Sequence, residues 1–577
     1  MSKMLRETNL VPQNSSSENP IAHRIWSAKY QYRSQGSVVD QTVSDTWKRV
    51  AHGLTENEKP SDRQAVASQF YDAMASYKLL PGGRILSGCG TARDVTLSNT
   101  FVMQEIPDSV EGIMDTAKQA ALTMKMGGGI GFDFSTLRPK GTGVAGLDCP
   151  AAGPLAAMDI CNSVCKMVVS GMGRGAMMAT LRCDHPDIEA FISAKEASAE
   201  LRNFNLSVMI TDDFMQAVRR NDDWNLTWNG WTLRQVKARE LWDKILTTNY
   251  ETAEPGVLFI DRINTLNPLN YLESISATNS CAEQPLPPNG TCPLASINLA
   301  RLVRSPFQPG ATMNFDELKR LAKVAVRMLD NAIDVSRFAV EAQKDEAQAK
   351  RRIGIGVTGV ADALMMLGLR YGSEQAAETL AQWMRTLQNA AYLASSKLAA
   401  ERGSFPLFDS TRHQKHTNIQ KLDPDVRQAI MRHGLRNGLL TTIAPTGTTS
   451  MYAGNVSSGI EPIFSASYQR LFSNPDGSKS LEAVEDYAIW LHRRIFGADA
   501  ALPEGFVTAM DLEPADHVAM QAAAQAWVDS GISKTVNCPA DMSFELFKDV
   551  YIKAYDSGCK GCTTFRPNAV TGSILST

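Results

Sequence analysis

The sequence lacks a long apolar run, a marked net charge and a pattern of closely spaced cysteines. No stretch approaches the roughly 18 apolar residues of a membrane helix, and the start of the chain lacks the apolar core of a signal peptide. Lysine and arginine number 58 against 61 acidic residues, so no global positive field points to nucleic acid. The ten cysteines include one C-x-x-C pair and do not resemble a secreted disulfide framework. These absences predict a cytosolic protein with reduced thiols.

The 577 residues are 44% apolar and 21% charged, as in an ordinary globular protein. The length allows one large domain with additions or several smaller ones. Residues 1–20 are polar and are interpreted as a disordered lead-in. In residues 21–80, apolar side chains recur at helical spacing, which predicts a small helical layer. The residues that show this spacing are Ile21, Ile25, Trp26, Val66, Phe70 and Met74.

From Pro81 to the end at residue 577, the pattern becomes α/β. Strand-like segments at 95–103 and 130–134 alternate with predicted helices at 113–126 and 151–169, and a second such series runs over 277–464. Two α/β halves are plausible, and the last hundred residues are predicted to be helices. The clearest helical faces belong to Leu318, Leu321, Ala325, Leu329 and Ile333, and to a helix over 382–401 that stops at Gly403.

Asn279, Cys281 and Glu283 stand at alternate positions, so in an extended segment they project to the same side. An amide, a thiol and a carboxylate there could bind a polyol, perform nucleophilic or redox chemistry and accept a proton. The alternative is a buried structural cysteine flanked by turn residues.

Three glycine-rich stretches invite a nucleotide interpretation. Residues 354–359 fit G-x-G-x-x-G without the expected βαβ setting, so close packing is favoured over a dinucleotide site. Residues 127–131 follow a helix and precede a strand, the reverse of a phosphate-binding turn, so close approach of backbone or substrate is favoured. Residues 444–450 follow an apolar strand at 439–443, and their N–H groups could cradle phosphate oxygens or form a capping turn.

Six collinear motifs together resemble the adenosylcobalamin-dependent (class II) ribonucleotide reductases over 21–573. In chain order the motifs are Pro81-Gly-Gly-Arg-Ile, Gly127 to Asp133 with Ser135 to Gly141, Arg174 to Asp187, Asn279 to Glu283, Pro445 to Thr448 with Ser458-Gly-Ile-Glu-Pro462, and Gly558 to Cys562. The resemblance implies a ten-stranded α/β barrel of two antiparallel five-stranded half-barrels around a finger loop. It also implies the cofactor adenosylcobalamin and a thiyl radical on Cys281 that takes the ribose 3′ hydrogen.

The same resemblance assigns the remaining site residues. Glu283 would take the proton of the 3′ hydroxyl, and Asn279 would hold the ribose. Substrate contacts are expected from Ser98, Asn99, Pro445, Thr446, Gly447, Thr448 and Thr449. Effector contacts are expected from Asp108, Ser170, Arg174, Ala194 and Arg202. No resident metal site is expected, and diphosphate substrates are favoured over triphosphates.

The class II assignment also depends on residues that are missing. A class I large subunit relays its radical through adjacent tyrosines near the C-terminus, whereas Cys562 to Arg566 contains none. Val570 to Ser573 lacks the context of the class III glycyl radical. No ATP-binding cone is expected before Ile21.

The pattern departs from the family at the redox thiols. Reduction needs a dithiol that becomes a disulfide. Cys292 matches one member of the pair, but Thr100 occupies the position of the other. Cys89 could serve instead. Cys559 and Cys562 have thiol-exchange spacing, with a structural role favoured.

The expected partners are a ribonucleotide, a nucleotide effector, a second copy in a homodimer and a thiol reductant. Because the family's shuttle cysteines are missing from the tail, the reductant could act through a separate polypeptide. Two other functions stay open: a catalytically impaired nucleotide-binding regulator, motivated by Thr100, and a thiol hydrolase using Cys281, for which no neighbouring histidine base is available in the sequence.

Overall fold

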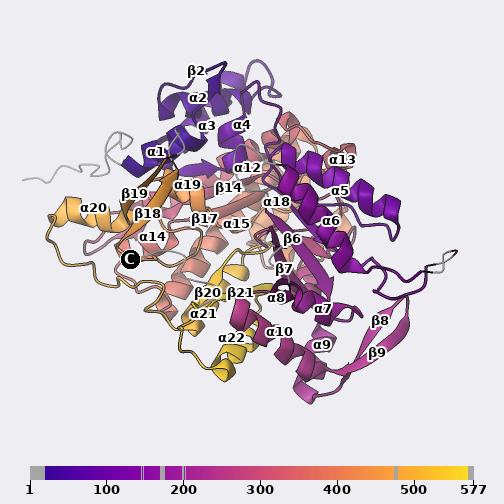
Figure 1. Cartoon of the computed structure of the whole chain (residues 1–577). Coiled ribbons are helices and arrows are strands. Elements are labelled where there is room, and N and C mark those ends of the chain that lie inside the picture. The colour runs from indigo at the N-terminus through magenta and orange to yellow at the C-terminus, as the bar shows by residue number, and fades with distance from the viewer. Residues whose placement is uncertain are drawn as a thin grey trace, which may run out of the picture.

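The computed structural model describes residues 20–144, 146, 149–168, 176–197, 201, 203–473 and 478–568. The N-terminal region, in indigo in Figure 1, is mainly helical, and the predicted residues Ile21, Ile25 and Trp26 are buried. Its elements are α1 (Pro20–Lys29), β1 (Arg33–Ser34), β2 (Ser37–Val38), α2 (Val43–Gly53), α3 (Arg63–Met74), η2 (Ala75–Tyr77), β3 (Leu79–Pro81) and α4 (Gly83–Gly88). Helical spacing therefore predicted the helices, but not the β1–β2 hairpin.

The next part of the chain supplies five mutually parallel strands in the order β4-β5-β6-β7-β10. Their apolar residues share a buried cluster with the helices that connect them. The strands are β4 (Thr100–Val102), β5 (Gly129–Asp133), β6 (Met177–Arg182), β7 (Phe204–Ile210) and β10 (Gly256–Phe259). The connecting elements are α5 (Val110–Lys125), α6 (Pro154–Met167), α7 (Ile188–Ile192), α8 (Ala194–Ala197), α9 (Asp212–Arg220), β8 (Asp223–Trp228), β9 (Trp231–Lys237), α10 (Ala238–Thr252) and α11 (Ile260–Thr265).

A second set of parallel pairings follows. Strand β14 (Leu294–Asn298) pairs with β17 (Gly354–Thr358), Ile355 bridges Thr441, and Ile443 bridges Ile532. Beyond this bridge, β20 (Thr535–Asn537) pairs in parallel with β21 (Gly561–Phe565). The predicted strand at 439–443 is thus present as two isolated bridges.

The two sets meet in antiparallel pairs on both sides. β21 pairs with β10, and β13 (Thr291–Cys292), which leads directly into β14, pairs with β4. The loop that carries Cys281 lies between two short antiparallel strands, β11 (Ala277–Thr278) and β12 (Pro285–Leu286). The fold is therefore mixed α/β beside an N-terminal helical region.

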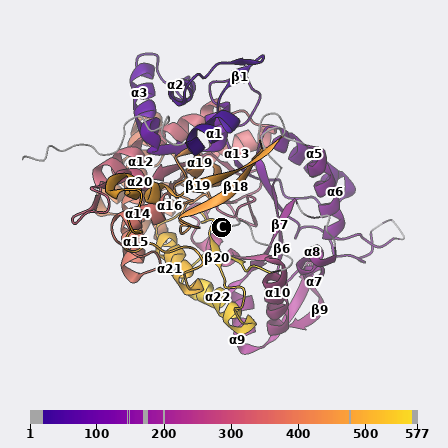
Figure 2. The same cartoon turned by 60° about the vertical axis from the view of Figure 1, so that its left-hand side comes forward.

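Helices cover the second set, and their periodicity was predicted correctly. All five apolar residues of the predicted face of α12 (Phe315–Val335) are buried, and α15 (Glu374–Arg402) ends at Gly403 as expected. Figure 2 shows α12, α14 and α15 on the side away from α5 and α6. The other elements are η3 (Leu299–Leu302), β15 (Val303–Arg304), β16 (Thr312–Met313), α13 (Glu341–Lys350), α14 (Val360–Met366), α16 (Ser410–Gln414), α17 (Thr417–Gln420), α18 (Pro424–His433) and α19 (Gly447–Tyr452).

The prediction of a helical tail was wrong in part. The helices α20 (Tyr487–Phe496), α21 (Pro514–Gln525) and α22 (Phe544–Asp556) are present. However, a hairpin of β18 (Ser467–Ser473) and β19 (Lys479–Glu485) precedes them, and β20 and β21 are interleaved with them. Short strands such as these carry little periodicity, and their pairing partners lie far away in sequence. Among the described residues, no helix is both long and apolar enough to cross a membrane.

Candidate active site

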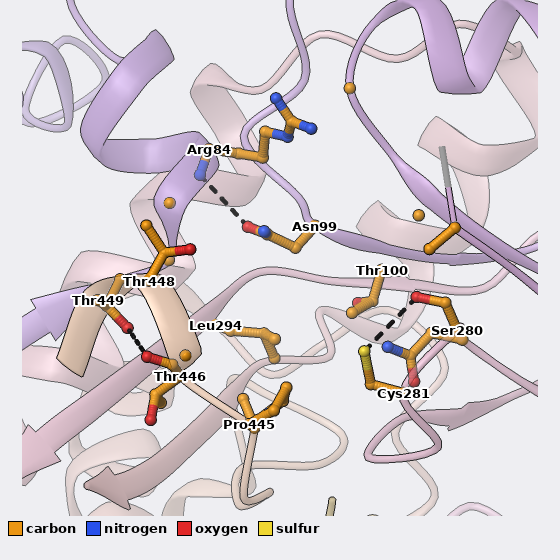
Figure 3. Close-up of a pocket in the computed structure, with 18 of the residues that line it drawn as sticks. Arg84, Asn99, Thr100, Ser280, Cys281, Leu294, Pro445, Thr446, Thr448 and Thr449 are labelled. Carbon is orange, nitrogen blue, oxygen red and sulfur yellow. Dashed lines mark hydrogen bonds between the residues drawn. The ribbon is translucent and has the colours of Figure 1, made fainter. Parts of the chain in front are cut away.

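Two cavities adjoin Cys281. The first, of about 390 Å³, lies between the loop of Cys281 and the turn that begins α19. Figure 3 shows Ser280 and Cys281 on one side of it, Pro445, Thr446, Thr448 and Thr449 on the other, and Arg84 and Asn99 along a third edge. The structure therefore brings together segments that are separated by more than 160 residues in the sequence.

The Cys281 thiol is exposed to this cavity, although protein surrounds it on most sides. That surrounding protein, and then the charge of Glu283, raises the pKa of the thiol to about 12. The neighbouring Ser280 hydroxyl lies 3.7 Å from the sulfur. A thiol with this pKa keeps its hydrogen at neutral pH, which suits hydrogen-atom transfer and disfavours a thiolate nucleophile.

Glu283 is buried beside Cys281, and its Oε2 has no hydrogen-bond partner. Burial raises the pKa of this carboxyl to about 7, against a lowering by the side chain of Asn279. A carboxylate with a pKa near neutrality is matched to proton transfer. Glu283 is among the residues that line the first cavity, so its carboxyl lies next to any ligand bound there.

Asn279 also stabilises the loop itself. Its Oδ1 accepts a hydrogen bond of 2.9 Å from the backbone N–H of Gln284. The amide thus closes the turn around Cys281 and orients Glu283. Asn279, Cys281 and Glu283 all line the first cavity, but the segment is a turn and not the extended strand from which their alternation was interpreted.

The predicted phosphate turn lines the same cavity. Thr446 has a left-handed φ of 50° and precedes the first turn of α19, so Gly447 and Thr448 are exposed to the cavity. The Thr446 hydroxyl accepts from the backbone N–H of Gly459, 2.8 Å away, in the second half of the same motif. A left-handed threonine is an unfavourable conformation that persists where surrounding contacts fix it, as at functional sites.

Not every predicted substrate residue lies here. Asn99 lines the cavity and accepts from the backbone N–H of Arg84, whereas Ser98 is buried and is not among the lining residues. Arg84 and Lys29 are lining cations to which the sequence analysis gave no role. Arg84 lies within the Pro81-Gly-Gly-Arg motif that resembles the family, so the sequence could have indicated it as a site residue. Lys29, at the end of α1, carries no local signal.

Thr100 stands in register with Cys292 across β4 and β13. Its hydroxyl donates a hydrogen bond of 2.9 Å to the carbonyl oxygen of Cys292. Cys292 is completely buried, and burial raises the pKa of its thiol. Cys89 lies elsewhere, packed against α2, with its sulfur 3.8 Å from the carbonyl oxygen of Val50, in the large hydrophobic cluster that includes the N-terminal helices. The structure does not bring Cys89 into either cavity lining.

The second cavity, of about 270 Å³, lies between the loop of Cys281 and the end of α21 with β21. Cys562 of the C-x-x-C pair lines it, and Cys559 is buried nearby. Among the described residues, no group of three or more His, Cys, Asp or Glu side chains is arranged to hold a metal ion. Cys281 lines both cavities. The phosphate turn also lines the first cavity, and β21 also lines the second.

The predicted effector residues can be described only in part. Asp108 forms an ion pair with Arg138 over 2.7 Å and lies beside Ser109, whose side chain, not that of Asp108, caps α5. Ala194 is buried at the start of α8. The other three lie outside the described residues: Ser170, Arg174 and Arg202.

Comparison with known families agrees with this architecture. Residues 98–565 match the family described as "Ribonucleotide reductase, barrel domain", and residues 16–94 match "Ribonucleotide reductase, all-alpha domain". The chain therefore belongs to the ribonucleotide reductase large-subunit family.

The individual proteins that this chain resembles also carry ribonucleotide reductase names. The chain is 34% identical over 596 residues to the "Vitamin B12-dependent ribonucleoside-diphosphate reductase" of Thermoplasma acidophilum, covering 99% of this chain and 74% of that protein. It is 35% identical over 567 residues to a protein of the same name from Mycobacterium tuberculosis, covering 94% and 77%. A "Ribonucleoside-diphosphate reductase large subunit" of Caenorhabditis elegans is 26% identical over 555 residues, covering 86% and 70%.

Proposed function

We propose that this chain reduces ribonucleotides, with diphosphates as the favoured substrates, to 2′-deoxyribonucleotides by radical chemistry at Cys281 with adenosylcobalamin as cofactor. The observation that carries the proposal is the pairing of a protonated thiol with a carboxyl of pKa about 7 at one cavity. The names of the first relatives, which include vitamin B12 and ribonucleoside diphosphate, support the cofactor and the substrate.

The residues of the first cavity have distinct parts in this chemistry. The turn from Pro445 to Thr449 presents backbone N–H groups and hydroxyls to the phosphates, and Arg84 and Lys29 add positive charge. Cys281 then faces the ribose, takes its 3′ hydrogen atom as a sulfur radical and returns one later. Glu283 accepts the proton of the 3′ hydroxyl, while Asn279 keeps the carboxyl oriented. The 2′ hydroxyl leaves as water, and the thiol reductant, oxidised to a disulfide, supplies the two electrons and two hydrogens.

The residues around Cys281 fit the cofactor, because a second, partly polar cavity reaches the same thiol from the side away from the phosphate turn. When bound, adenosylcobalamin supplies the radical that converts the thiol of Cys281 to its reactive form. The residues of β21 and α21 that line this cavity would hold the nucleoside part of the cofactor. The absence of tyrosine from β21 supports class II over a class I radical relay.

We also propose a ten-stranded barrel. One half comprises β4, β5, β6, β7 and β10, and the other comprises β14, β17, the segments around Thr441 and Ile532 with β20, and β21. The antiparallel pairs β10–β21 and β13–β4, on the two sides, support closure into a ring with Cys281 on the loop inside it.

A homodimer through α5 and α6 is proposed from the apolar side chains exposed on these two helices. Exposed apolar side chains that gather on neighbouring helices favour contact with another protein surface. The exposed residues are Val110, Met114, Leu122, Ile160 and Met167. Asp108, beside the start of α5, then lies next to this surface, as expected for an effector site near a dimer interface.

The electron donor is proposed to be a small thiol or a separate polypeptide with a mobile cysteine pair. A bulky thioredoxin would be excluded from a thiol as buried as Cys292. We expect dithiothreitol to support multiple turnovers and thioredoxin alone not to do so. Product formation with thioredoxin alone would remove the need for a second polypeptide.

The central test is anaerobic incubation with adenosylcobalamin, a ribonucleoside diphosphate, an effector nucleotide and dithiothreitol. Deoxynucleotide formation that Cys281→Ala abolishes is the expected result. Thr100 favours one other candidate, a catalytically impaired regulator. Effector binding without any product from the wild-type chain would support that candidate and overturn the proposed activity.

A further inference from the structure

The second cavity contains polar groups that the proposed reaction has not used. Its wall is formed by β7, β10, the Cys281 loop, the end of α21 and the segments around β20 and β21. Figure 1 shows α21, β20 and β21 gathered together in yellow below the centre of the molecule. The long polar side chains from the C-terminal part of the wall are Gln521, Gln525, Lys534 and Lys560, and the short ones include Ser533, Thr535 and Thr563.

The charged groups in this wall already have protein partners. Lys534 donates to Glu461 over 2.6 Å and lies 2.8 Å from Nδ1 of His517. Lys560 donates to the carbonyl oxygens of Asp529 and Ser530. Glu254, which lines the opposite side, pairs with Lys195 over 2.6 Å. An added ion would therefore have to compete with existing pairs.

Gln521 and Gln525 differ from these residues. Both side chains are more than nine-tenths buried, with 3% and 5% of their surface exposed, and the Oε1 of each has no hydrogen-bond partner. They stand four residues apart on α21, a spacing that places them on one face of the helix. A buried carbonyl oxygen without a donor is costly, so each of these atoms favours a ligand that donates a hydrogen bond.

The orientation of the two amides is fixed by their nitrogen atoms. Nε2 of Gln525 donates to the carbonyl oxygens of Val528 and Ser530, at 3.3 and 3.1 Å. Nε2 of Gln521 donates to the carbonyl oxygen of Gly561 over 3.1 Å. If the oxygen and nitrogen of either amide exchanged places, its Oε1 would lie next to a backbone carbonyl oxygen, which has no hydrogen to donate. The unpartnered atoms are therefore acceptors, and the missing ligand groups are N–H or O–H donors.

We propose that Gln521 and Gln525 bind the adenine amino group of the cofactor's nucleoside in the second cavity, and so position that nucleoside next to Cys281. This inference depends on the proposed function. The 6-amino group of adenine has two N–H donors, which matches the two free acceptors in number. A volume of about 270 Å³ is near the lower limit of small-molecule pockets, roughly 300 Å³, and suits a nucleoside better than a whole corrinoid.

The experiment measures equilibrium binding of 5′-deoxyadenosine and of 5′-deoxyinosine, which has a carbonyl oxygen in place of the amino group. A ribonucleoside diphosphate and an effector nucleotide are present in excess to occupy the sites for phosphorylated nucleotides. We expect the wild-type protein to bind 5′-deoxyadenosine about 3- to 10-fold more tightly. Equal binding of the two nucleosides by the wild-type protein would overturn the inference, and this comparison needs no variant.

The variants Gln521→Leu and Gln525→Leu test which residues are responsible. Each should reduce or abolish the preference for 5′-deoxyadenosine. Gln119→Leu is the matched control, because Gln119 also has a buried Oε1 without a partner but lies on α5 and lines neither cavity. A preference retained in both α21 variants, or reduced equally by Gln119→Leu, would contradict the assignment.

Hydroxocobalamin, which carries corrin amides but no adenosyl group, tests the other source of N–H donors. If the α21 variants weaken hydroxocobalamin and leave 5′-deoxyadenosine unchanged, the corrin amides are the donors and the nucleoside assignment is wrong. If the wild-type protein forms deoxynucleotides but binds 5′-deoxyadenosine and 5′-deoxyinosine equally, the proposed activity stands and only the role of Gln521 and Gln525 is overturned. Discrimination without any product would instead overturn the proposed activity.

Discussion

The carbonyl oxygen of Thr278 lies 1.8 Å from the point at which a β carbon would stand on Gly131. Thr278 ends β11, just before Asn279 and Cys281, and Gly131 is in the middle of β5. No side chain can occupy that position without moving the Cys281 loop away from the sheet. The glycine thus allows the reactive loop to approach the strand.

Gly131→Ala should therefore displace the loop and destabilise the protein by about 3 kcal/mol, because backbone atoms must move. Deoxynucleotide formation should fall by at least 100-fold, since the loop carries both Cys281 and Glu283. Gly143→Ala is the matched control, because no atom lies within 4 Å of the point that its β carbon would occupy, and it should change stability by less than about 0.5 kcal/mol. Denaturant unfolding and the activity assay check both. An active Gly131→Ala protein would show that the loop tolerates the shift.

Glu283 should give the turnover rate a dependence on pH. Its carboxyl has a pKa of about 7 and must be ionised to accept a proton, so kcat should rise as the pH increases from about 6 to 8. Glu283→Gln should bind substrate normally and lose most turnover. Glu346→Gln, which neutralises another buried carboxyl outside both cavity linings, should keep the pH profile of the wild type. Undiminished turnover in Glu283→Gln would remove the residue from its assigned role.

The same carboxyl should make the folded state less stable at high pH. Its pKa is raised from 4.5 to about 7 on folding, so the protonated form favours the folded state. The contribution is fully present below about pH 4.5 and is lost as the pH rises through 7. Glu283→Gln should therefore gain stability relative to the wild type between pH 4.5 and 8, by about 3 kcal/mol. A difference between the two proteins that does not change with pH would contradict the raised pKa.

Thr100→Cys should provide the thiol that the pair with Cys292 lacks. Residues directly opposite in an antiparallel pair have Cα atoms about 4.5–5.5 Å apart, within the range that a disulfide spans. After one turnover without external reductant, we expect a disulfide between positions 100 and 292, found by alkylation and mass spectrometry, and more product than the wild type forms. Thr291→Cys, one position along on the partner strand, is the control. Equal disulfide formation with Cys292 in both variants would indicate non-specific oxidation.

The sequence predicted those parts of the site that are local in the chain. Asn279, Cys281 and Glu283 lie within five residues, and the turn over 444–450 is also continuous, so residue type and spacing marked both as candidate sites, while the resemblance to a family supplied the roles expected of them. Arg84 belongs to one of the matching motifs, but no role was predicted for it. Lys29 could not be found in this way, because it reaches the cavity only when α1 packs beside α19, hundreds of residues later.

The same limit applies to the fold. The long helix α12 shows its buried face over six turns of sequence, so its existence and its orientation were predictable. Strand β21 has five residues, and its partner β10 lies about 300 residues earlier. Its pairing depends on the completed sheet, and its residues alone indicate little.

The packing of α1 against α19 has a consequence for synthesis. Tyr30, just after α1, has its ring centroid 5.0 Å from that of Tyr452 at the end of α19, and Trp47 donates to the Tyr452 hydroxyl over 2.9 Å. At a ribosomal rate of about 5–20 residues per second, more than 400 residues and roughly 20–80 s separate the two helices. Helix α1 therefore lacks its packing partner α19 until more than 400 further residues have been synthesised. The cavity that Lys29 lines is completed late in translation.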